Sequence, residues 1–299
     1  MFLWPSGAPG ALGNAPTDKP RMYIFLSKKR STSAAILVIP GGGYEHVALG
    51  HEGFQIAEWL NAQGMAAFVL DYRVAPYHYP VEINDGRRAM RLIRAHAAEY
   101  GIDPNRLGVW GSSAGGHLAS SVGTHCEKAA PSAANNDPDS DPVDQLSCKP
   151  DFMVLAYPVI SMELPETHAG SRRNLLGPDP DPALAHEYSN QFAVTADTPP
   201  TFLFATTNDP VVPVENSLDF YRALVQNHVH AELHLFDYSN HGCGLCGSIV
   251  PLRVWPSLLR TWLIDRSFLP PNAPPPPPPQ PNWPVWPKGY TGPGEYSGQ

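Results

Sequence analysis

Short runs of consecutive apolar residues alternate along this chain with stretches in which apolar residues recur every three or four positions. The apolar runs that suit strands are AAILVIP (34–40), AAFVLDY (66–72), RLGVWG (106–111), FMVLAYP (152–158), TFLFAT (201–206) and AELHLFDY (231–238). Helical spacing predicts helices over 51–63, 83–100, 114–123, 214–227 and 253–266. Most of the apolar runs are continuous, which is typical of strands covered by helices on both faces. The pattern predicts an α/β fold around a mainly parallel sheet.

The end of this alternation marks a boundary near Phe268. Beyond Leu269 the chain reads PPNAPPPPPPQPNWPVWPKGYTGPGEYSGQ, which cannot continue a helix or a sheet. We therefore expect one globular domain over 1–268 and an extended or disordered proline-rich tail over 269–299. The tail suits a stiff spacer, and it could also contact another domain or protein.

Composition narrows the classes of partner. Of the 299 residues 42% are hydrophobic and 16% are charged, and the net charge is −8. An acidic chain without clusters of Lys and Arg argues against nucleic acid and anionic membranes as partners. No apolar run reaches the roughly 18 residues that a membrane span needs.

The turn VWGSSAGGHLAS joins a predicted strand to a predicted helix. Gly111, Ser113 and Gly115 match the G-x-S-x-G pattern, in which small residues let the strand and the helix approach closely around an exposed serine. Ser113 is the candidate nucleophile. The amide of Ala114, at the start of the helix, would point at a developing oxyanion.

A second turn, PGGGYEHVALGHEG, follows the first apolar run. Its glycines allow backbone amides to turn inward, so Gly42 and Gly43 are candidates for the other half of an oxyanion hole. Phosphate binding is disfavoured, because the turn lacks both G-x-G-x-x-G and a Gly-Lys-Ser/Thr ending. We assign Tyr44, which follows the glycines, and Ser112, which precedes the nucleophile, to substrate binding.

A serine nucleophile needs a base and a carboxylate that orients the base. Asp209 follows one predicted strand and His241 follows the next, in the chain order Ser, Asp, His. Asp209 is preferred to Asn208, whose neutral amide cannot stabilise an imidazolium, and to Glu215 and Asp237.

These motifs, together with LWPSGAPGALGNAPTDKP, FVLDYRVAP, GIDPNRLGVWGSSAGGHLA, YPVISM, HAGSRRNLLG and DPVVPVENSLDFYRAL, occur in order over about Leu3 to Leu245. The chain resembles the α/β-hydrolase esterases of the acetylxylan/feruloyl esterase type, which are related to the hormone-sensitive-lipase-like enzymes. The resemblance implies a carboxylic ester hydrolase with no metal or other cofactor, active on short acyl esters such as acetyl groups of plant polysaccharide. It also implies the triad Ser113, Asp209 and His241, with a small cap over residues 159–198.

The chain departs from this family at three places. Asn208 stands where the family often has the first of two acids, Cys243 stands where it has an aromatic residue, and a proline-rich tail is unusual. An esterase that acts on feruloyl or aryl esters is the alternative within the family, and two other classes of function stay open. HGCGLC offers His241, Cys243 and Cys246 as zinc ligands, although their spacing is shorter than that of zinc fingers. The fold could also serve a non-catalytic binding protein.

The four cysteines bear on the compartment. They permit two disulfides, and Cys126 could pair with Cys148 across an Asn/Asp/Pro-rich loop. The start MFLWPSGAPG does not look like a signal peptide. We expect a secreted or periplasmic protein whose signal is absent from this numbering, with a cytoplasmic protein as the alternative.

Overall fold

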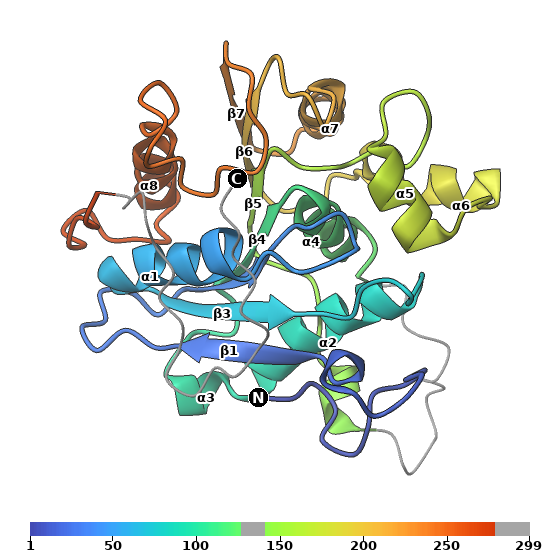
Figure 1. Cartoon of the computed structure of the whole chain (residues 1–299). Coiled ribbons are helices and arrows are strands. Elements are labelled where there is room, and N and C mark those ends of the chain that lie inside the picture. The colour runs from blue at the N-terminus through green and yellow to red at the C-terminus, as the bar shows by residue number, and fades with distance from the viewer. Residues whose placement is uncertain (127–140, 279–299) are drawn as a thin grey trace.

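The computed structural model describes residues 1–126 and 141–278, and this part of the chain is built around one seven-stranded sheet (Figure 1). The strands are β1 (Arg21–Phe25), β2 (Ala35–Ile39), β3 (Ala66–Asp71), β4 (Leu107–Ser112), β5 (Met153–Ala156), β6 (Thr201–Thr206) and β7 (Ala231–Phe236). Their order across the sheet is β1-β3-β2-β4-β5-β6-β7. β1 pairs antiparallel with β3 and the other pairs are parallel, which confirms the predicted α/β fold.

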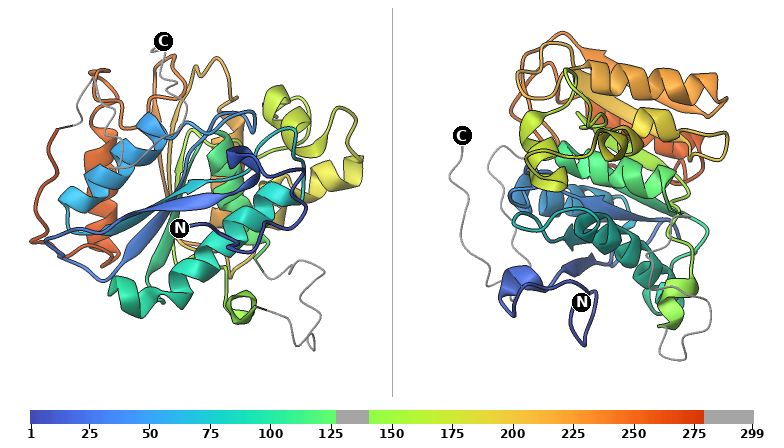
Figure 2. Two further views of the ribbon diagram at one scale, coloured as in Figure 1. Left: turned by 60° about the horizontal axis from the view of Figure 1, so that its bottom comes forward. Right: turned by 90° about the vertical axis from the view of Figure 1, so that its right-hand side faces the viewer.

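Helices cover both faces of this sheet (Figure 2). The α-helices are α1 (Gln55–Ala62), α2 (Val81–Ala95), α3 (Ala97–Tyr100), α4 (Ala114–Thr124), α5 (Ala169–Leu176), α6 (Pro182–Glu187), α7 (Glu215–Gln226) and α8 (Trp255–Asp265). Four short turns of other helix types are η1 (Pro16–Asp18), η2 (Gly50–Phe54), η3 (Pro142–Gln145) and η4 (Asn190–Ala193). Among the described helices, none is both long and apolar enough to cross a membrane.

The core consists of two apolar clusters, one on each face of the sheet. Alternate residues of a strand serve opposite clusters, because successive side chains point to opposite faces. In β2, Leu37 belongs to the cluster that contains residues of α2, α4 and α7, whereas Ile36 and Val38 belong to the cluster that contains residues of α1 and α8. Burial on both faces explains why this strand is apolar at every position.

The strand order reverses between β2 and β4. The chain passes from β2 to β3 on one side and then returns to place β4 on the other side of β2. Loops at the carboxyl ends of such a pair leave the sheet in opposite directions, and the crevice between them is the usual binding position in this fold class. The glycine turn after β2 and Ser113 after β4 both lie there.

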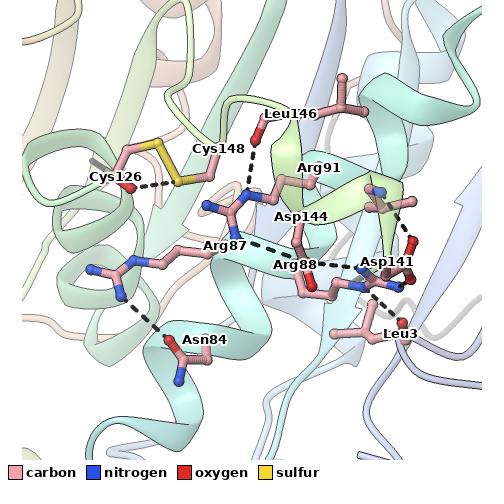
Figure 3. Close-up of polar contacts among 11 residues, drawn as sticks. Leu3, Asn84, Arg87, Arg88, Arg91, Cys126, Asp141, Asp144, Leu146 and Cys148 are labelled. Atoms are coloured by element: carbon pink, nitrogen blue, oxygen red, sulfur yellow. Dashed lines mark hydrogen bonds and ion pairs between the residues drawn. A yellow bond between two sulfur atoms is a disulfide. The ribbon is translucent and has the colours of Figure 1, made fainter. Parts of the chain in front are cut away.

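The segment 141–148 is fastened to α2 by arginine side chains and to the end of α4 by a disulfide (Figure 3). Arg88 bonds the carboxylates of Asp141 and Asp144, and Arg91 Nε donates to the carbonyl of Leu146 at 2.9 Å. Cys126 at the end of α4 is bonded to Cys148, as predicted. The Asn/Asp/Pro-rich loop that this disulfide closes lies mostly outside the described residues.

The chain continues to pack beyond the predicted domain end at Phe268. Leu269 and Ala273 are buried in the cluster formed with α8, and the Ala273 carbonyl accepts a hydrogen bond from Arg260 Nη2 at 2.7 Å. The expectation of an unpacked tail is therefore wrong for these first residues, since small apolar side chains among the prolines still find space on α8. Residues 279–299 lie outside the described residues.

Candidate active site

Ser113 occupies a sharp turn between β4 and α4. Its backbone has φ 52° and ψ −122°, a conformation that L residues rarely adopt. Two glycines make the turn possible: a Cβ on Gly111 would overlap the Gly115 carbonyl, and a Cβ on Gly115 would overlap the Ile39 carbonyl of β2. The strand and the helix therefore approach closely at these glycines, which is the reason predicted for the G-x-S-x-G spacing.

The structure brings the three predicted triad residues into one hydrogen-bonded series. Ser113 Oγ lies 2.7 Å from His241 Nε2, and His241 Nδ1 lies 2.7 Å from Asp209 Oδ2. The side chain of Asp209 is 2% exposed and that of His241 is 13% exposed, so water competes little for either. The serine hydroxyl can lose its proton to Nε2 while Asp209 holds the proton on Nδ1.

The loop after β6 decides between Asp209 and its neighbour. Asp209 Oδ1 accepts hydrogen bonds from the amides of Val211 and Val212, which leaves Oδ2 aimed at His241. Asn208 is exposed, and its amide instead donates to Asp237 Oδ1 at 3.0 Å. Asn208 and Asp237 therefore point away from His241.

The glycine turn after β2 faces Ser113 across the crevice. The Gly42 carbonyl accepts from the amides of Glu45 and His46, which closes the turn on itself. Within residues 1–126 and 141–278, the N–H groups of Gly42, Gly43 and Ala114 have no acceptor. Three donors at one end of a crevice can stabilise a negative oxygen.

The two residues assigned to substrate binding have buried side chains that bond to other parts of the protein. Tyr44 is fully buried, and its hydroxyl donates to His117 Nδ1 at 2.8 Å. Ser112 is also fully buried, and its Oγ accepts from Trp110 Nε1 at 3.3 Å. The assignment is corrected for both side chains: the left-handed φ of 57° at Tyr44 turns the ring inward, and Ser112 belongs to β4.

The pocket around Ser113 has a volume of about 290 Å³. Its lining residues are Gly42, Gly43, Glu45, His46, Ala48, His51, Glu52, Ser113, His168, Val211, His241 and Gly242. Seven of these twelve residues have polar side chains. The expected cap is present as α5, α6 and η4, and of that segment His168 reaches the pocket.

His168 and Glu52 were not identified from sequence. His168 begins α5, and its Nδ1 accepts from the amide of Ser171, which leaves the proton of the neutral ring on Nε2. Burial and then the proximity of His241 lower the pKa of His168. The signals for both residues were weak, because neither stands in a spacing pattern that indicates chemistry.

The loop after His241 argues against the zinc site. Cys243 and Cys246 are joined by a disulfide, so their sulfur atoms are not thiolate ligands. The ring of His241 uses both nitrogens for Ser113 and Asp209. The position where the family resemblance led us to note an unusual cysteine is thus a covalently closed turn.

The known proteins that are similar to this chain include esterases. A family model described as BD-FAE matches residues 22–224. An acetylxylan esterase of Xylanibacter ruminicola is 34% identical over 230 residues, which cover 76% of this chain and 44% of that protein. An endo-1,4-beta-xylanase B of Butyrivibrio fibrisolvens is 36% identical over 229 residues, which cover 75% of this chain and 34% of that protein. The chain spans less than half the length of these two curated relatives.

Two solved structures are similar over nearly their whole length. An acetyl ester-xyloside bifunctional hydrolase from Caldicellulosiruptor lactoaceticus has 42% sequence identity and a TM-score of 0.81, with coverage of 90% of this chain and 96% of that chain. A thermophilic esterase from Thermogutta terrifontis, with propionate bound, has 26% identity and a TM-score of 0.68, with coverage of 88% and 94%.

Proposed function

This chain belongs to the BD-FAE family of α/β-hydrolase esterases, and from that premise we propose that it is a serine carboxylesterase that removes acetyl and other short acyl groups from plant polysaccharide such as acetylated xylan. The observation that carries the proposal is the hydrogen-bonded series of Ser113, His241 and Asp209 beside a glycine turn with unpaired amides.

In the proposed first half-reaction, Ser113 Oγ attacks the ester carbonyl and its proton passes to His241 Nε2. Asp209 stabilises the imidazolium that forms. The amides of Ala114, Gly42 and Gly43 receive the negative carbonyl oxygen, and each donor of this kind contributes roughly 3 kcal/mol to lowering the barrier. His241 then protonates the departing alcohol, which leaves an acyl-enzyme on Ser113.

In the second half-reaction, water occupies the position that the alcohol has left. His241 Nε2 accepts a proton from this water as its oxygen attacks the acyl carbonyl. The tetrahedral intermediate then releases the acid, and Ser113 Oγ takes the proton back from His241 Nε2. The same amides stabilise the second tetrahedral intermediate. Every step uses groups of this chain, so we expect activity without an added metal or cofactor.

The size and polarity of the pocket support the proposed substrate class. A volume of about 290 Å³ is at the small end of ligand pockets, which are roughly 300–1,000 Å³. Such a pocket suits a short acyl group better than a fatty chain. The Nε2–H of His168 and the carboxylate of Glu45 suit hydrogen bonds with the hydroxyls of a sugar alcohol. Acetyl ester and xylan also appear in the names of the similar proteins.

The test is hydrolysis of a panel of esters by the wild type and Ser113→Ala. We expect acetyl esters of 4-nitrophenol and of xylo-oligosaccharide to be cleaved faster than octanoyl or feruloyl esters, and Ser113→Ala to lose at least about a thousandfold in kcat. Faster cleavage of feruloyl or other aryl esters would replace the proposed substrate class. An inactive wild type on the whole panel would favour a non-catalytic role.

We also propose that the protein works outside the cytoplasm. Both pairs of cysteines are disulfide-bonded, and structural disulfides persist mainly in oxidising compartments. Thiol titration of unfolded, unreduced protein from its native source should find no free thiol. Four free thiols would contradict export.

A further inference from the structure

Glu52 presents a buried carboxylate to the edge of the pocket. The residue lies in η2 and is 2% exposed. Its Oε2 accepts a hydrogen bond from the amide of Gly41 at 2.8 Å. A Cβ on Gly41 would lie 2.8 Å from the Cβ of Ser113, so this bond holds the glycine turn directly beside the nucleophile.

The other carboxylate oxygen of Glu52 is connected to the loop that carries His241. Oε1 accepts from the hydroxyl of Tyr157 at 2.9 Å, and this hydroxyl accepts from the amide of Gly244 at 2.7 Å. The ring of Tyr157 also packs edge-on against the His241 ring, with centroids 5.1 Å apart. The Glu52 side chain therefore links the glycine turn to Tyr157 and to the loop that carries His241.

We propose that Glu52 is a positioning residue for the proposed ester hydrolysis, because its carboxylate fixes the distance between the glycine turn and the loop that holds His241. The inference rests on the proposed function. Glu52 acts through Gly41 and Tyr157, and it touches neither the acyl carbon nor the proton in transfer.

The carboxylate of Glu52 is the centre of this network. Both oxygens accept hydrogen bonds, which offsets part of the cost of burying a carboxylate. Burial and the neighbouring Glu52 raise the pKa of Tyr157 well above its usual value, so its hydroxyl keeps the proton that it donates. His51 Nε2 lies 3.8 Å from Oε1 and adds a further polar neighbour.

The loops on either side leave little room for adjustment. A Cβ on Gly244 would overlap the carbonyl of His51, so the His241 loop and η2 are in backbone contact. Loss of the Glu52 bonds would let this contact and the glycine turn shift independently. A displacement of about 1 Å at reacting groups can cost roughly a hundredfold in rate.

The experiment measures phosphonylation of the active serine by a small 4-nitrophenyl phosphonate, which reads the base and the oxyanion donors without reference to a natural ester. Wild type, Glu52→Gln and Tyr157→Phe are compared at saturating and subsaturating reagent, and rates are normalised to the sites finally titrated. Glu58→Gln is the matched control, because it makes the same change in α1 outside the pocket lining.

For Glu52→Gln we expect the maximal rate to fall about tenfold to a hundredfold, with half-saturation changed less than threefold. Tyr157→Phe should lose less, because the Gly41 bond remains, and Glu58→Gln should match the wild type. A merely structural role would instead lower the number of titrated sites and leave the rate per site unchanged. That result, or a rate per site within twofold of the wild type, would overturn the inference.

Ser113→Ala in the same assay separates the two proposals. If it is not phosphonylated while Glu52→Gln reacts like the wild type, only the positioning inference fails. If Ser113→Ala reacts as fast as the wild type, the assigned nucleophile is wrong and the inference falls with it.

Discussion

At the scale of single residues, the carboxylate of Asp209 has a fixed orientation. One oxygen accepts from two backbone amides, and the other is left for His241 Nδ1. We predict that Asp209→Asn lowers kcat by roughly three to four orders of magnitude without unfolding, since an amide there favours the wrong imidazole tautomer. Asn208→Ala is the control and should cost little. Steady-state kinetics with far-UV circular dichroism check both, and a larger loss in Asn208→Ala would reverse the assignment.

His117 is a buried histidine that links Tyr44, which follows the glycine turn, to the cap. Its Nδ1 accepts from Tyr44 and its Nε2 donates to the carbonyl of Tyr188 at 2.8 Å. Burial lowers the pKa of His117 from 6.5 to about 4. Because the folded state keeps the ring neutral, its contribution to stability is complete above pH 6.5 and is lost as the pH falls from 6.5 towards 4.

The prediction concerns the free energy of unfolding of the wild type and His117→Gln from pH 7 to pH 4. The wild type should lose about 3 kcal/mol more than the variant over this range, which is the shift in pKa expressed as free energy. Urea titrations at each pH measure the difference, in which other titrating groups cancel. Parallel curves for the two proteins would contradict the prediction.

The residues that we propose to react were easier to predict than those that we propose to support them. Ser113, Asp209 and His241 stand in a motif or directly after a strand, and their chemistry restricts the choice. Tyr44 was misplaced because its backbone conformation, not its position beside the glycines, decides where the ring lies. Glu52 was missed because its importance comes from a contact with Tyr157, 105 positions away, and no local spacing indicates such a contact.

At the scale of elements, the disulfide between Cys126 and Cys148 closes a loop with a sequence separation of 22. We predict that the double variant Cys126→Ala/Cys148→Ala loses about 3 kcal/mol of unfolding free energy, by the loop-entropy estimate. Its kcat should stay near that of the wild type, because neither cysteine lines the pocket.

The second disulfide supplies the comparison for this prediction. Cys243→Ala/Cys246→Ala opens a loop with a separation of only 3, so its entropic effect on unfolding should be smaller. Urea titration and ester kinetics on both double variants check the pair of expectations. A greater loss of stability in the second variant would show that loop length does not govern the effect.

The predicted strands differ in burial. β2 to β6 overlap predicted apolar runs, because strands covered on both faces are largely apolar. The edge strand β7 is only partly buried, and it overlaps the run AELHLFDY, in which apolar residues alternate with polar ones. β1 was not predicted, although it overlaps the apolar run MYIFL (22–26), and this edge strand is only partly buried. The predicted helix over 83–100 is divided at His96 in the structure into α2 and α3. The sequence predicted a single helix because the helical spacing of apolar residues continues across His96.

At the scale of the whole molecule, the C-terminal segment has a packed part and a part outside the described residues. Leu269 and Ala273 are buried against α8. We predict that removal of 279–299 leaves the melting temperature and the esterase activity unchanged, whereas removal of 269–299 lowers the melting temperature by several degrees, because it exposes apolar surface. Differential scanning fluorimetry and acetyl ester hydrolysis compare the two truncations. A drop with the shorter truncation would show that the final residues also dock.

The groups that we propose to react and the cap come from separate parts of the chain. The loops after β2, β4, β6 and β7 supply the glycine turn, Ser113, Asp209 and His241, whereas the cap contributes His168 to the pocket. Mutations in the cap can therefore have different effects from mutations in the loops that carry Ser113, Asp209 and His241. Insertions and substitutions in the cap can alter which alcohol is accepted while the hydrolytic machinery is inherited intact. After gene duplication, the two copies can therefore come to accept different substrates while they still catalyse the same reaction.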